Sequence, residues 1–86
     1  MGYDLTGETG NEFRLCIGWW NDMWEYICKY GMRKKILTQE IFEKGNYNSN
    51  ETINTKEVLI SVNECLDSLE MFKKFLQNSG DYFSID

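Results

Sequence analysis

The chain has 86 residues and a mass of 10.2 kDa, enough for one domain with a modest hydrophobic core. Hydrophobic residues make up 42% and charged residues 27%, which is typical of a folded globular protein and excludes intrinsic disorder. Nine Lys and Arg against 14 Asp and Glu leave a net charge of −5, which argues against direct nucleic-acid binding because that requires a basic face. The acidic excess lies in residues 36–86 and would suit a basic partner.

The missing residue types and motifs exclude several chemistries. Histidine is absent, which excludes a His-based triad and His-ligated zinc or haem. The cysteines are spaced too loosely for a metal cage or a disulfide framework and indicate reduced thiols in a cytosol: Cys16, Cys28 and Cys65. The N-terminus lacks a secretory signal, and no apolar segment reaches the roughly 18 residues of a membrane span. We therefore expect a cytosolic protein without catalytic activity, cofactor, metal site or membrane contact.

The first half of the chain predicts two extended segments followed by a helix. Residues 3–5 form an extended piece among turn-forming residues, and residues 13–17 alternate weakly, which indicates a short strand. Residues 19–30 predict a helix that ends at Gly31. Apolar residues occupy two neighbouring faces of this helix, so we expect it to be covered on more than half of its circumference.

Capping signals organise the second half. Thr38 is the expected N-cap of a short helix that ends at Gly45. Asn54 and Glu57 resemble a capping box at the start of a third helix. The apolar stripe that follows predicts either one helix of about 25 residues or two helices with a break near Ser68.

These elements predict a small, mainly helical α+β domain of three to four helices, with residues 1–86 as a single domain. The alternating tail, residues 81–86, is expected to pair with the N-terminal segment in a minimal β-sheet, which residues 13–17 would join. A helix-only bundle is the alternative.

Three tryptophans within six residues are the most unusual feature of the sequence. Trp20 and Trp24 share one helical face and are expected in the core, whereas Trp19 lies on the second face and is the expected exposed indole. An exposed tryptophan is typical of a binding surface. Asp22 and Glu25 share one side of the same helix, but we interpret them as charges that favour the start of the helix, not as a catalytic pair.

The predicted binding site joins four residues on one surface, over Trp20 and Trp24 as supporting core: Arg14, Trp19, Tyr47 and Asn48. Arg14 has alternatives, because it could also stack on a ring or pair with Asp4 or Glu12. Tyr47 and Asn48 belong to a loop of turn-forming residues that either is a structured turn or offers a contact point. The start of the tryptophan helix presents unpaired N–H groups, which would favour an anionic group there.

Five short motifs are spread over most of the chain: Met1-Gly2-Tyr3-Asp4-Leu5, Phe13-Arg14, Trp19-Trp20-x3-Trp24-x-Tyr26-Ile27-Cys28, Gly45-x-Tyr47-Asn48 and Asn78-Ser79-Gly80. Together they resemble a family of uncharacterised small proteins from bacteriophages and prophages. The chain departs from that pattern where Gly18 replaces the first of three tryptophans and Asn46 replaces a loop histidine. Since the family has no settled activity, the resemblance implies a phage protein that acts in the bacterial cytosol.

The resemblance and the missing catalytic groups lead us to expect a non-enzymatic, phage-type binding protein that inhibits host antiviral defence. It would block a defence protein through an aromatic or acidic surface, or sequester a nucleotide-like signal with the base on Trp19 or Tyr47 and phosphate near Arg14. The expected partner is thus a host defence protein or such a signal, and the chain could also form a homo-oligomer. The alternative is a structural or housekeeping phage protein with no inhibitory role.

Overall fold

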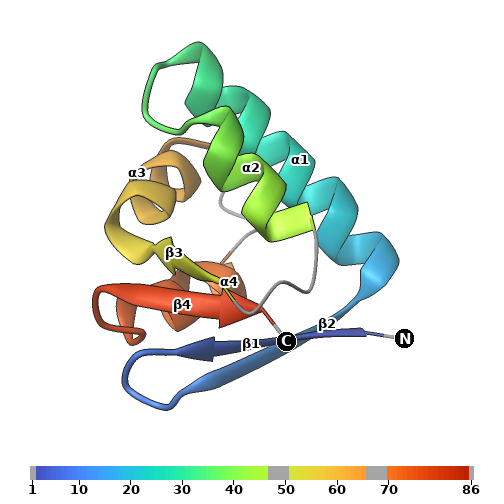
Figure 1. Ribbon diagram of the computed structural model, residues 1–86, viewed down its shortest axis with the longest axis vertical. Helices are drawn as coiled ribbons and strands as arrows, with labels where there is room; N and C mark the ends of the chain where they lie inside the picture. The colour runs from blue at the N-terminus through green and yellow to red at the C-terminus, as the bar shows by residue number, and fades with distance from the viewer. Residues whose placement is uncertain (1, 47–50, 66–69, 86) are drawn as a thin grey trace.

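The computed structural model describes residues 2–46, 51–65 and 70–85, and an antiparallel sheet forms one layer of this fold (Figure 1). Its four strands lie in the order β2-β1-β4-β3. Their bounds are β1 Gly2–Gly7, β2 Glu12–Cys16, β3 Thr52–Asn54 and β4 Tyr82–Ile85. The C-terminal strand therefore pairs with the N-terminal one, as the alternation of the tail predicts.

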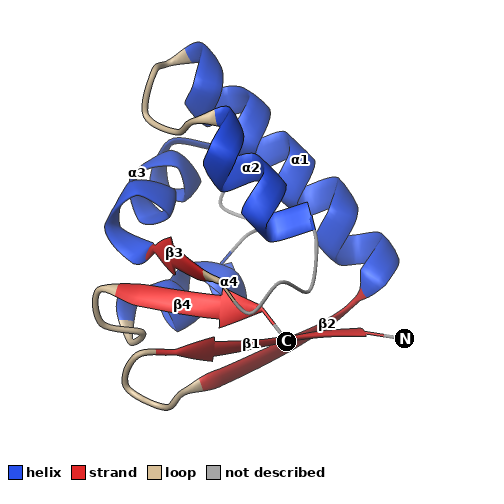
Figure 2. Cartoon of the chain, in the orientation of Figure 1, coloured by secondary structure: helices blue, strands red, loops and turns tan. Residues whose placement is uncertain are grey.

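The two faces of the sheet differ in polarity. On one face Leu5 lies between Phe13 of β2 and Ile85 of β4, and Leu5 and Ile85 are fully buried. On the other face Asp4 lies opposite Arg14, and none of the described helices covers β1 and β2 there (Figure 2). Successive side chains of a strand alternate between faces, so this pattern sets the register of the sheet.

Helices form the second layer on the apolar face of the sheet (Figure 2). Their bounds are α1 Ile17–Arg33, α2 Gln39–Asn46, α3 Thr55–Cys65 and α4 Glu70–Gln77. Phe75 of α4 stacks on Phe13 of β2 and meets Phe83 of β4 edge to face, with ring centroids 5.6 and 5.9 Å apart. Trp20 of α1 meets Tyr3 of β1 edge to face, with ring centroids 6.2 Å apart. Large aromatic rings thus join the two layers.

The fold class is confirmed as a small, mainly helical α+β domain, and the helix-only alternative is wrong. The predicted strand at 13–17 is Glu12–Cys16, because Ile17 already belongs to α1. Of the two alternatives for the apolar stripe after Asn54, the structure has the two helices, α3 and α4; Ser68, the expected position of the break, lies outside the described residues. No helix of the described part is long and apolar enough to cross a membrane.

The two predicted caps are present, but one predicted helix end is wrong. Thr38 Oγ1 accepts a hydrogen bond from the N–H of Ile41 at 3.3 Å, and Asn54 Oδ1 accepts one from the N–H of Glu57 at 3.0 Å. Helix α1 continues through Gly31 to Arg33. Gly31 is buried because the side chain of Leu37 packs on its Cα, so this glycine serves a close approach and not a C-terminal cap.

Candidate functional site

Trp19 lies in the first turn of α1 and is 73% exposed. Among the described residues, no hydrogen bond, ion pair or ring contact engages its side chain. Helix α1 begins directly after β2, with Cys16 as its N-cap, so the strand fixes the position of this turn. The sequence prediction that Trp19 is the exposed indole agrees with this structure. A large apolar side chain left in water at the start of a helix is a candidate contact point.

Trp20 and Trp24 form a rigid support for the first turns of α1, the helix that carries Trp19. Both are fully buried, and their rings stack with centroids 5.1 Å apart. The Nε1–H of Trp20 donates to the carbonyl oxygen of Gly45 at 2.8 Å, and the Nε1–H of Trp24 donates to that of Phe42 at 3.0 Å. The prediction that these two residues are core is confirmed. Their bonds tie the C-terminal end of α2 to the N-terminal half of α1.

The end of α2 also contacts the sheet. The Tyr3 hydroxyl donates to the carbonyl oxygen of Asn46 at 3.2 Å, so Asn46 is held beside β1 and close to Trp20. Tyr47 follows at once in the sequence. The predicted contribution of Tyr47 and Asn48 to the site lies outside the described residues. What the structure brings together is the first half of α1 and the end of α2, at Gly45 and Asn46.

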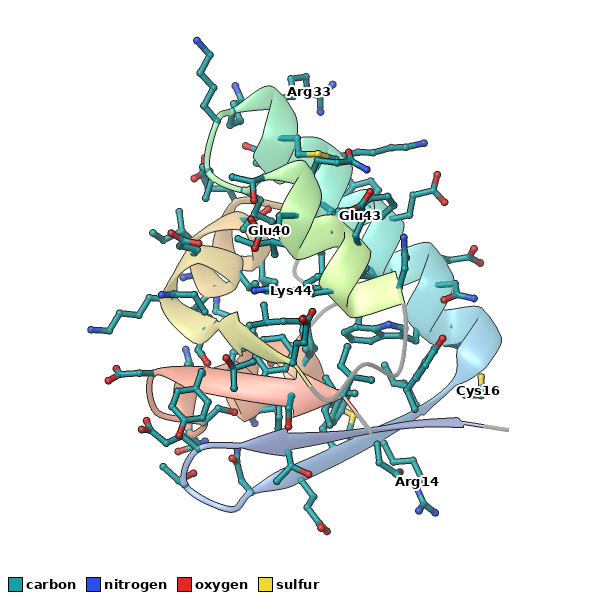
Figure 3. The ribbon with its side chains drawn as sticks, in the orientation of Figure 1. Arg14, Cys16, Arg33, Glu40, Glu43 and Lys44 are labelled. Atoms are coloured by element: carbon teal, nitrogen blue, oxygen red, sulfur yellow. The ribbon has the colours of Figure 1, made fainter. Side chains whose placement is uncertain are left out.

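Arg14 lies apart from this support, on the polar face of the sheet (Figure 3). Its Nε and Nη2 donate to the two carboxylate oxygens of Asp4 at 2.5 and 3.2 Å. The hydrogen bond with Arg14 lowers the pKa of the Asp4 carboxyl, and the same bond raises the pKa of Arg14. Of the alternatives for Arg14, pairing with Asp4 is therefore the one that the structure contains. The pair borders a shallow hollow of about 480 Å³ that Thr6, Glu12 and Phe13 complete.

A stripe of apolar residues runs along the side of α1. The sequence predicts that other elements cover it, but in the structure its residues are exposed or half-buried. We call it the α1 stripe, and its members recur at spacings of three and four: Trp19, Met23, Tyr26 and Tyr30. Tyr26 is 49% exposed, and Met23 and Tyr30 are half-buried. The expectation that α1 packs on more than half of its circumference is wrong, because the neighbouring elements cover the face of Trp20, Trp24 and Ile27 and stop beside this stripe.

Tyr30 ends the α1 stripe among charged groups. Its hydroxyl donates to Glu64 Oε1 of α3 at 3.2 Å. Burial raises the pKa of Tyr30, and the hydrogen bond with Glu64 raises it further. The Arg33 guanidinium lies 5.7 Å and the Lys34 ammonium 6.0 Å from the centre of the ring. Two cations therefore gather at the C-terminal end of α1.

A second hollow, of about 500 Å³, lies between α2 and the edge of the sheet formed by β3 and β4. Ile53 and Tyr82 contribute apolar surface, and acidic side chains dominate its charged lining: Glu40, Glu57 and Asp81. The Lys44 ammonium is 3.6 Å from the Glu40 carboxylate. Sequence reasoning missed this hollow, since three separate segments form it, residues 38–44, 52–57 and 81–82, and none of them carries a local signal.

The cysteines are free thiols among the described residues, and no group of three or more His, Cys, Asp or Glu side chains there could hold a metal ion. Burial raises the pKa of Cys28 to about 12, and burial also raises that of Cys65. Cys16 is exposed. A thiol with so high a pKa is protonated near neutral pH, so Cys28 is a packing residue of the core and a poor nucleophile.

No protein-family model, curated protein or solved structure matches this chain. The resemblance to small phage proteins therefore rests on the sequence motifs alone. Within the described residues, Trp20 and Trp24 are completely buried, whereas Trp19 is exposed. This difference marks Trp19 as a surface residue and the other two as core.

Proposed function

We propose that this chain is a non-enzymatic, phage-type binding protein that inhibits host antiviral defence by blocking a defence protein in the bacterial cytosol. The observation that carries the proposal is Trp19, an exposed indole on a rigid support. The helix turn that carries Trp19 directly follows β2 and is anchored by the buried Trp20, and tryptophan is among the residues that contribute most at protein interfaces. The phage-like motifs supply the biological setting, and the absence of histidine from the sequence supports a role without catalysis.

Blocking a protein is favoured over sequestering a nucleotide-like signal. The nucleotide mechanism needs Arg14 near phosphate, and the guanidinium of Arg14 is already bound by both carboxylate oxygens of Asp4. Arg14 also lies on the polar face of the sheet, whereas Trp19 projects from a helix that packs on the other face. The net charge of −5 would further oppose a phosphate-bearing ligand.

Phage plating tests the proposal. Bacteria that carry individual defence systems would express the wild-type protein, Trp19→Ala or a control, Met71→Ala, which truncates a comparably exposed apolar residue of α4 (75% against 73%). We expect the wild type to restore plating on at least one host, Met71→Ala to behave like it and Trp19→Ala to lose the effect. Restoration by none of the proteins on any host would overturn the proposal and leave a structural or housekeeping role.

A second measurement separates the two inhibitory mechanisms. Native mass spectrometry of protein purified from an infected lysate is expected to show a retained protein partner and no retained nucleotide. If a nucleotide is retained and Arg14→Ala releases it, sequestration is the mechanism. If Arg14→Ala leaves both the mass and the plating effect unchanged, Arg14 takes no part in the site.

A further inference from the structure

The charges along the exposed side of α1 are separated by sign. Asp22, in the first half of the helix, has no ion pair among the described residues. Glu25 and Lys29 pair with each other at 2.6 Å and cancel. Arg33, in the last turn, lies over the Tyr30 ring and has no carboxylate partner in the described part of the chain. The helix thus presents an unpaired acid near one end and an unpaired base at the other.

These two charges flank the same side of the α1 stripe. Asp22 and Arg33 are 11 residues apart, which is about three helical turns, so both project beside Tyr26. Figure 3 shows Arg33 at the end of α1 that is farthest from Cys16. An apolar centre with opposite charges at its two ends is complementary to its own copy in the reverse direction, since each acid then meets a base.

We infer that the part of the α1 stripe from Met23 to Tyr30 binds a second copy of this chain, with the two α1 helices antiparallel about a twofold axis. Asp22 of each copy faces Arg33 of the other, and Tyr26 and Tyr30 pack between these ion pairs. A twofold interface uses the same patch on both subunits, so each charged pair occurs twice. A parallel arrangement would place like charges together, which is unfavourable.

This dimer goes beyond the proposed function and does not occupy its site. The paired segment runs from Asp22 to Arg33, so Trp19 lies beyond it at each outer end. The two indoles would be separated by about 25 Å along the helix axes. A dimer would therefore present two Trp19 sites and bind a repetitive or dimeric partner more tightly than one subunit alone.

A charge-reversal series followed by sedimentation equilibrium tests the dimer. Both single variants, Asp22→Arg and Arg33→Asp, place like charges together and should weaken dimerisation by about tenfold or more. The double variant Asp22→Arg/Arg33→Asp restores opposite charges and should recover dimerisation. Tyr26→Ala should weaken it by removing the apolar centre. Glu43→Arg reverses an exposed charge on α2 and should leave the dimer unchanged.

The outcomes are decisive because Asp22, Tyr26 and Arg33 are exposed, and circular dichroism can confirm that each variant remains folded. A wild-type protein that is monomeric at about 100 μM would overturn the inference. So would a double variant that stays as weak as the single ones, or an effect of Glu43→Arg equal to that of Asp22→Arg. Trp19→Ala should leave dimerisation unchanged, so failure of the dimer and failure of the defence proposal can be told apart.

Discussion

Replacing Gly45 by alanine should destabilise the protein, although the same change usually stabilises a helix. Gly45 is in the last turn of α2, and its φ is not positive, so alanine can adopt this backbone. Glycine in a helix interior costs about 0.5–1 kcal/mol relative to alanine. A Cβ at this position, however, would lie 2.0 Å from Cε2 and 2.1 Å from Nε1 of Trp24. Contacts so short cannot persist, so either the helix or the indole must move.

Trp24 has little freedom to move. Its ring is fully buried, is stacked on Trp20 and donates to the carbonyl oxygen of Phe42. Overpacking a core costs about 1–3 kcal/mol, and displacing α2 would also strain the hydrogen bond from Trp20 to Gly45, worth about 1 kcal/mol. After the gain in helix propensity is subtracted, we expect a net loss of about 2 kcal/mol. For a domain of this size that lowers the melting temperature by about 10 °C.

Urea denaturation and thermal melts of Gly45→Ala and Gly18→Ala provide the comparison. Gly18 is also helical, but a Cβ there would meet nothing within 4 Å, so alanine should stabilise α1 by up to about 1 kcal/mol. The two substitutions should therefore have opposite signs. If Gly45→Ala is as stable as the wild type, the reasoning is refuted, since α2 would not pack on Trp24 at this distance.

Three further predictions follow from burial. Trp24→Ala should lower the free energy of unfolding by about 3–5 kcal/mol in urea, whereas Trp19→Ala should change it by less than about 0.5 kcal/mol; equal losses would contradict the assignment of core and surface. In native thiol labelling, Cys16 should react first and Cys28 only on unfolding, and Cys16→Ser should remove the fast phase. Burial raises the pKa of Cys28 to about 12, so the folded state retains a proton that the unfolded state loses. Stability should then fall by up to about 1.4 kcal/mol per pH unit from pH 9 upward, with a smaller slope in Cys28→Ala.

Local chemistry explains which parts of the fold could be predicted from the sequence. The caps at Thr38 and Asn54 need only a side-chain oxygen within three residues of a free N–H, and both are present. In the tail, apolar and polar residues alternate at every second position, which is typical of a strand, and this pattern correctly indicates pairing with β1. Fold class therefore followed from signals that act over a few residues.

Contacts between distant segments explain what could not be predicted. Strand β3 has three residues, and only its pairing with Tyr82–Ser84 of β4 makes it a strand. Gly31 carries the usual signal for a helix end, but the packing of Leu37 on it lets α1 continue to Arg33. The exposure of Tyr26 also depends on where the other helices stop. None of these leaves a local pattern in the sequence.

The candidate site shows how nearness along the chain differs from nearness on a surface. Arg14 and Trp19 are five residues apart, and this separation led us to predict one shared surface. The junction of β2 and α1 lies between them. Side chains of a strand point alternately to its two faces, so Arg14 points away from the helices while Phe13 and Leu15 face them. By contrast, Gly45 is 25 residues from Trp20 and hydrogen-bonds to it directly. The end of α2 is therefore packed against the indole that follows Trp19 in the sequence, whereas Arg14 faces away from the helices.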